Sequence, residues 1–167
     1  MNSDTIKGRL VPILTGRLDA LASGNPTGGG SLAEQLDQVS LAAHFSSVDR
    51  LACAAESIVA ASPRLRGLTG AQLRELADRL SDRLSYLEES LVVVEIDPVA
   101  PEIQLRSKSP RQDEETRTYF EVQVGQQGIA LRRFEKRTGD ARRGIAAVLS
   151  RDVFCRLCVD LVSAACE

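Results

Sequence analysis

The chain has 167 residues, of which 43% are apolar and 26% are charged, and its formal net charge is −2. This composition is typical of an ordinary globular protein and excludes wholesale disorder. The nearly balanced charge gives no overall attraction to nucleic acid or to an anionic membrane. The sequence has no stretch approaching the ~20 apolar residues that a membrane-spanning helix needs, so we expect no membrane partner.

Residues 5–23 are predicted to form a short amphipathic helix, because their leucines recur at helical spacing. The glycine-rich residues 24–30 that follow are costly to order and predict a flexible linker. We therefore divide the chain into an N-terminal arm, residues 1–30, and a single α+β domain, residues 31–167. The arm's helix either folds back on the domain or docks on a partner chain.

Residues 31–89 are predicted to form an antiparallel helical hairpin. Ser31 and Glu34 have the spacing of a capping box, and a helical pattern of apolar residues continues from there to Ser62-Pro63. A second box-like start lies at Thr69. It opens a stripe of leucines at positions 73, 76, 80, 84 and 87, with charged residues on the opposite side.

From Leu91 the apolar period changes from 3.6 to 2, which predicts an antiparallel β-meander of four to five strands over residues 91–149. Gly125 and Gly128 bracket a turn between two of these strands. Ser150 is placed to cap a last helix, residues 150–165, which packs on the sheet. The expected fold class is thus α+β, with a tethered short helix, a helical hairpin, the meander and a C-terminal helix.

The four cysteines are interpreted as reduced thiols, which indicates a cytoplasmic location. Three of them fall within one helical pattern, so the set does not form a secreted disulfide framework. The Cys155–Cys158 spacing recurs in redox sites, but Ser150 as the N-cap places Cys155 beyond the first turn, where the helix no longer activates a thiol. Residues of this kind usually pack in the core. The cysteines are Cys53, Cys155, Cys158 and Cys166.

No catalytic constellation can be named in the sequence. His44 is the one histidine, and no motif for a nucleophile or a metal surrounds it. Glu88 and Glu89, at the junction of helix and sheet, are interpreted as solvated. We therefore expect no catalytic residue, no metal and no cofactor.

Basic residues gather in two connections of the predicted meander. Residues 104–143 contain ten basic and six acidic side chains, a net charge of +4. In a simple meander the two connections leave from the same end of the sheet, where converging guanidinium groups can bind phosphate or carboxylate. The alternative is two solvated loops that keep the protein in solution. The candidate anion-binding residues are Lys108, Arg111, Lys136, Arg137, Arg142 and Arg143.

Three hypotheses of function follow. The first is a non-enzymatic protein-binding or assembly domain that recognises a protein partner or a second copy of itself. The second is a module that binds an anion or nucleic acid through the two basic connections, with nucleic acid the less favoured ligand. An enzyme is third, because no nucleophile–base pair is present in the sequence.

Overall fold

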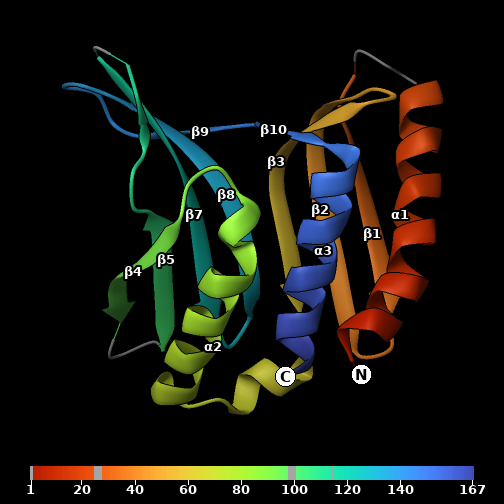
Figure 1. The fold of residues 1–167 in the computed structure, drawn as a ribbon, viewed down its shortest axis with the longest axis horizontal. Helices are drawn as coiled ribbons and strands as arrows, with labels where there is room; N and C mark the ends of the chain where they lie inside the picture. The colour runs from red at the N-terminus through yellow and green to blue at the C-terminus, as the bar shows by residue number, and fades with distance from the viewer. Residues whose placement is uncertain (1, 25–27, 98–100, 114) are drawn as a thin grey trace.

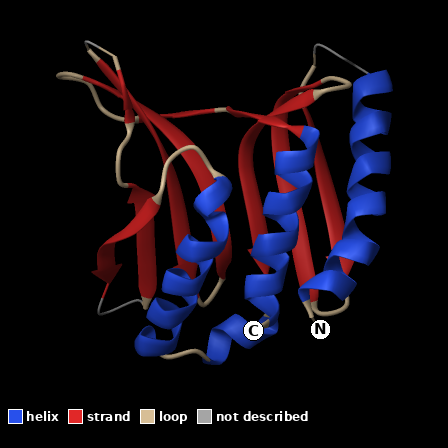
Figure 2. Ribbon diagram, viewed as in Figure 1, coloured by secondary structure: helices blue, strands red, loops and turns tan. Residues whose placement is uncertain are grey.

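A computed structural model describes residues 2–24, 28–97, 101–113 and 115–167. One antiparallel sheet with three α-helices on one of its faces makes up the fold (Figures 1 and 2). The helices are α1 (Ser3–Gly24), α2 (Gly70–Arg83) and α3 (Arg151–Cys166), and the short 3-10 helices are η1 (Pro63–Gly67) and η2 (Leu84–Tyr86). The strands are β1 (Gly30–Leu36), β2 (Val39–Val48), β3 (Ala52–Ala61), β4 (Leu91–Asp97), β5 (Glu102–Ser107), β6 (Arg111–Gln112), β7 (Thr116–Gly125), β8 (Gly128–Arg137), β9 (Arg143–Ile145) and β10 (Ala147–Ser150).

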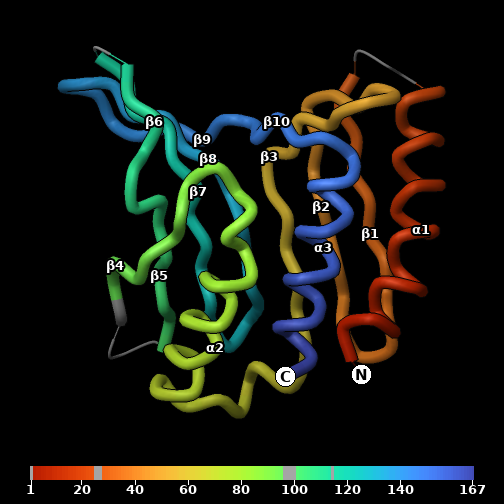
Figure 3. The backbone as a smooth tube through the Cα atoms, in the orientation of Figure 1, coloured from red at the N-terminus to blue at the C-terminus, as the bar shows by residue number. Residues whose placement is uncertain are grey.

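The α+β class is confirmed, but the number of strands exceeds the prediction of four to five. The described residues contain ten strands, and the main path across the sheet is β1-β2-β3-β8-β7-β5-β4. The three short strands lie off this path: β6 pairs with β7, β9 with β8, and β10 with β3. Strands β9 and β10 follow one another and fill the opening where β8 and β3 diverge (Figure 3).

The predicted helical hairpin over residues 31–89 is wrong in its first half, because residues 30–61 form β1, β2 and β3. The apolar pair Leu32 and Leu36 lies four residues apart, and this spacing places two side chains on one face of a strand as well as of a helix. The true period shows in β2, where alternate residues are buried. Asp37, with a φ of 54°, lies in the turn between β1 and β2 and interrupts the alternation of buried residues there.

Two of the predicted helices are confirmed together with their caps. Thr69 and Gln72 form the capping box that opens α2. The side chain of Ser150 accepts a hydrogen bond of 3.2 Å from the Val153 N–H at the start of α3. α2 covers the half of the sheet formed by β4, β5 and β7, and α3 covers the centre (Figure 1).

The N-terminal helix α1 folds back on the rest of the chain. Its leucines face β1, β2 and α3 and belong to the one large apolar core. Arg17 also forms an ion pair with Glu34 of β1, and Arg9 pairs with Asp37 at 2.9 Å. Of the predicted linker, residues 25–27 lie outside the described residues, whereas Gly30 begins β1. The division of the chain at residue 30 stays a prediction. No helix in the described part of the chain is long and apolar enough to cross a membrane.

Candidate anion-binding face

The second face of the sheet carries no helix, and polar side chains alternate on it with the buried residues of the core. In β7, Phe120 and Val122 belong to the apolar core beneath the helices. Tyr119 and Glu121 therefore point to the opposite face, because successive side chains of a strand alternate. This uncovered face is where a ligand can approach the sheet without displacing a helix.

Strand register brings basic and aromatic side chains together on the uncovered face. Tyr119 is directly opposite Phe134, and the next pair on the same face is Arg117 with Lys136. On the other side of β7, Arg106 of β5 is opposite Glu121. We call this group the basic face; it consists of Arg106, Arg117, Tyr119, Glu121, Phe134, Lys136 and Arg142.

Two guanidinium groups of the basic face lie on aromatic rings. The guanidinium carbon of Arg106 is 5.0 Å from the centre of the Tyr119 ring, and that of Arg142 is 4.4 Å from the centre of the Phe134 ring. The two rings are themselves stacked, with centroids 6.0 Å apart. Each cation–π contact contributes about 0.5–1 kcal/mol where it is exposed.

Glu121 forms ion pairs with both of these arginines. Its side chain is only 3% exposed, and its Oε2 accepts hydrogen bonds from Arg106 Nη2 at 3.2 Å and from Arg142 Nη1 at 2.5 Å. The Nε of Arg106 is buried and finds no hydrogen-bond partner among the described residues. The carboxylate therefore fixes the positions of the arginines, and the outer parts of their guanidinium groups are left to solvent or to a ligand.

A cavity of about 590 Å³ opens over the basic face. Arg106, Arg117, Lys136 and Arg142 supply four positive charges to its lining, and Glu95 supplies one negative charge. With the buried Glu121 included, the net charge around the cavity is +2, although the whole chain carries −2. Such a cavity attracts carboxylates or phosphates, which arginine binds with directed hydrogen bonds.

The structure places two of the six residues predicted to bind an anion at the cavity of the basic face. These two are Lys136 and Arg142. Arg137 and Arg143 instead surround Glu135, with Arg143 Nη2 at 2.6 Å from its Oε1, beside a separate hollow of about 190 Å³.

The remaining two predicted residues lie elsewhere. Arg111 lines a different cavity, together with Phe120 and Leu149 of the core. Lys108 is exposed, and its backbone N–H donates to the Ser90 carbonyl at 2.7 Å. An anion-binding role for these residues stays a prediction.

Sequence reasoning did not assign Arg106, Arg117 and Tyr119 to the site. A signal for two of them was present in the sequence, since the turn between Gly125 and Gly128 fixes the register of β7 and β8. That register pairs Arg117 with Lys136 and places Tyr119 two residues away on the same face. Arg106 comes from β5, and its position depends on pairing with β7 that no short turn sets.

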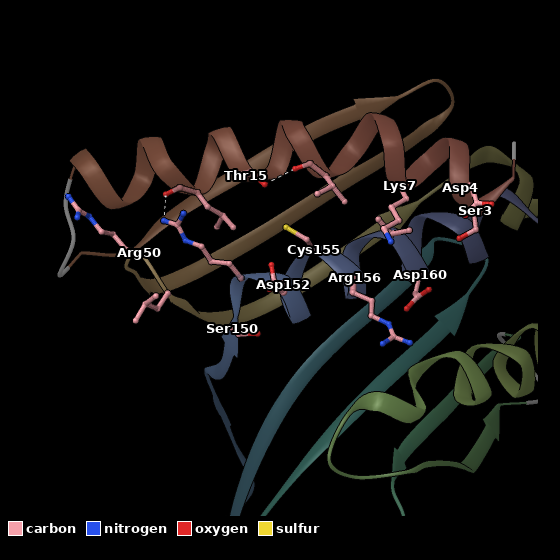
Figure 4. Close-up of a pocket in the computed structure, with 15 residues that line it drawn as sticks. Ser3, Asp4, Lys7, Thr15, Arg50, Ser150, Asp152, Cys155, Arg156 and Asp160 are labelled. Atoms are coloured by element: carbon pink, nitrogen blue, oxygen red, sulfur yellow. Dashed lines mark hydrogen bonds between the residues drawn. The ribbon is translucent and has the colours of Figure 1, made fainter.

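A larger hollow of about 810 Å³ lies between α1 and α3 (Figure 4). Basic and acidic side chains are interspersed along it, as Lys7 with Asp4 and Arg156 with Asp152 illustrate. This mixture favours no charge class of ligand. Cys155 lies between the two helices near Thr15 in this view, and burial followed by the nearby Asp152 raises the pKa of its thiol. A thiol with a raised pKa is less reactive, so Cys155 is not an activated nucleophile.

The other residues considered for chemistry lie apart from the basic face. Burial raises the pKa of Cys53 to about 12 and that of Cys158 well above its usual value. His44 is exposed on β2. Glu89, interpreted as solvated, is only 6% exposed and pairs with Arg133 at 3.1 Å.

Within the described ranges, no three His, Cys, Asp or Glu side chains are grouped so as to hold a metal ion. No family model matches the chain, and no curated protein or solved structure matches it. The function is therefore argued from the geometry of the basic face.

Proposed function

We propose that the chain is a non-enzymatic protein-binding domain that binds an acidic segment of a partner protein on the basic face. The observation that carries this proposal is the convergence of four basic side chains on one cavity of the uncovered sheet face. Clusters of arginine are a recurring means of recognising acidic segments of proteins.

The basic face is organised before a ligand arrives. Arg106 and Arg142 are each held by an aromatic ring and by Glu121. Fixing a long side chain in advance removes an entropic cost of about 0.5–1.5 kcal/mol per side chain from binding. A ligand carboxylate can then accept hydrogen bonds from the exposed N–H groups of Arg106 and Arg142.

An acidic peptide fits the basic face better than nucleic acid does. Single-stranded nucleic acid binds by stacking its bases on open aromatic faces. Here Tyr119 is only 6% exposed, and Arg142 lies over the ring of Phe134. The net charge of −2 also opposes the approach of a long polyanion, whereas a short acidic segment meets mainly the local positive charge.

The test is the binding of a fluorescent glutamate-rich peptide, measured by anisotropy at several salt concentrations. The double substitution Arg117→Ala and Lys136→Ala removes two exposed charges that face each other across β7 and β8. We expect it to weaken binding by about tenfold or more, equivalent to about 1.4 kcal/mol. The double substitution Arg137→Ala and Arg143→Ala is the matched control, because it removes the same charge from outside the cavity.

Two results would contradict the proposal. One is equal weakening by both double variants, which would mean that only the overall charge matters. The other is tighter binding of an oligothymidine than of the peptide, which would favour nucleic acid. A peptide in which glutamine replaces every glutamate is expected not to bind. Self-association and a cytoplasmic location stay predictions.

A further inference from the structure

A second candidate site lies on the helix-covered side of the sheet, where β8 and β3 diverge. The cavity there has a volume of about 480 Å³ and is bounded by η2, by β10 and by the first turn of α3. We call it the seam pocket. Its volume lies within the range of about 300–1,000 Å³ that is usual for small-molecule sites.

The walls of the seam pocket combine apolar and polar side chains. Leu87, Phe120, Leu149 and Val153 line it, and the first three are buried in the core. These apolar side chains favour the hydrocarbon part of a ligand, at roughly 0.8 kcal/mol for each buried methylene group.

Arg133 supplies a charged hydrogen-bond donor to this cavity. Its side chain is only 17% exposed, and its guanidinium carbon lies 4.5 Å from the centre of the Phe120 ring. Nη2 donates to Glu89 Oε1 at 3.1 Å and to Thr118 Oγ1 at 3.2 Å. Nη1 and Nε have no hydrogen-bond partner in the described part of the chain, so N–H donors of a mostly buried arginine remain unused.

The unused N–H donors of Arg133 favour a ligand that accepts hydrogen bonds, such as a carboxylate. Arg111 and Arg133 contribute two positive charges, which Glu88 and the Glu89 paired with Arg133 balance, so the net charge itself favours neither sign. Arg111 is exposed, so its side chain can close over the charged end of a ligand. Arginine binds carboxylate better than other simple groups because its planar N–H donors match the two oxygens.

We propose that the seam pocket binds a small amphipathic carboxylate. The hydrocarbon body packs against Phe120, Leu149 and Val153, and the carboxylate accepts hydrogen bonds from the free N–H groups of Arg133. Arg111 adds a second positive charge at the carboxylate. The site lies on the opposite side of the sheet from the basic face, so it does not depend on the acidic-peptide proposal.

The experiment is calorimetric titration of the whole chain with octanoate and, separately, with octylamine. We expect octanoate to bind and octylamine, which has the same hydrocarbon chain and the opposite charge, not to bind. Arg111→Ala is expected to weaken octanoate binding several-fold. Arg66→Ala is the matched control, because it removes one exposed arginine that lines neither this cavity nor the basic face and should leave binding unchanged.

Val153→Phe fills the cavity and is expected to abolish octanoate binding; its circular dichroism spectrum reports whether it folds. Unchanged octanoate binding in a folded Val153→Phe variant would overturn the assignment of the site. Equal binding of octanoate and octylamine would overturn the role of the two arginines, and so would equal effects of Arg111→Ala and Arg66→Ala. The absence of octanoate binding at millimolar concentration would overturn the proposal as a whole.

Discussion

The buried ion pair between Glu89 and Arg133 gives a sharp prediction about stability. Glu89 is 6% exposed and Arg133 is 17% exposed, and their closest oxygen and nitrogen are 3.1 Å apart. Glu89 Oε2 is already buried without a hydrogen-bond partner in the described structure. The substitution Arg133→Met therefore leaves a buried carboxylate with no cation to balance it.

The expected loss follows from the burial of the pair. Two opposite charges about 4 Å apart attract each other by about 4 kcal/mol at an effective dielectric constant of about 20. Removing both ions from water costs several kcal/mol each, so the intact pair contributes little net stability. Losing one partner, however, costs about 3–5 kcal/mol, because the other charge stays buried. The double variant Glu89→Leu, Arg133→Met is expected to be within about 1 kcal/mol of the parent or more stable.

The assay is urea unfolding followed by far-ultraviolet circular dichroism, since the chain has no tryptophan for fluorescence. The control is Arg137→Met, because Arg137 is 60% exposed and its contact with Glu135 is a loose 3.7 Å. We expect that control to change the unfolding free energy by no more than about 0.5 kcal/mol. A loss below about 1 kcal/mol in Arg133→Met, or a double variant no better than the single one, would refute the reasoning.

Four further predictions concern the core, a cap and the thiols. Leu14→Ala, at a fully buried position of α1, should lower the unfolding free energy by about 2–5 kcal/mol, and a change below about 1 kcal/mol in urea unfolding would show that α1 is not packed in the core. Thr69→Ala removes half of a capping box and should cost about 1 kcal/mol in the same measurement, with Thr69→Ser as the conservative control. Alkylation at pH 8 followed by mass spectrometry should label Cys166 long before the buried Cys53. The pKa of Cys53 is raised by burial from 9.0 to about 12, so its contribution to stability should be complete below about pH 9 and be lost as the pH rises toward 12. The loss should be smaller in Cys53→Ala, where Cys155 and Cys158 still contribute.

The parts of the fold that were predicted correctly are specified by caps, turns and apolar spacing within one segment of the sequence. The capping box at Thr69 and the leucines after it specify α2 within one segment of the chain. The alternation on both sides of Gly125 and Gly128 specifies the β7–β8 hairpin. In both cases the residues that decide the structure are close together in the sequence.

Residues 30–61 were mispredicted because their local signals are ambiguous. Leu32 and Leu36 fit both periods, and the many alanines of β3 pack well in either element. The turn from β2 into β3 is set locally, where Asp49 Oδ1 accepts hydrogen bonds from the N–H groups of Leu51 and Ala52, at 2.7 and 2.8 Å. The choice of strand over helix is decided by tertiary pairing. β3 then pairs with β8 and β10, which lie far along the sequence.

The sequence predicted the positive charge of the candidate site better than it predicted which residues form the site. Positive charge in residues 104–143 was evident, and Lys136 and Arg142 do line the basic face. Arg137 follows Lys136 in β8 and points to the opposite face, because neighbouring side chains of a strand alternate. Arg137 and Arg143 both contact Glu135 instead. Arg106 joins the site only through the pairing of β5 with β7.

The most direct test of the central claim is a map of backbone amide chemical-shift changes when the glutamate-rich peptide is added to labelled protein. We expect the largest changes on the basic face, at Arg106, Arg117, Tyr119 and Lys136, with no more than small changes between α1 and α3. Saturable changes confined to the α1–α3 hollow, or no changes at a peptide concentration that saturates the anisotropy signal, would contradict the assignment of the basic face as the binding site.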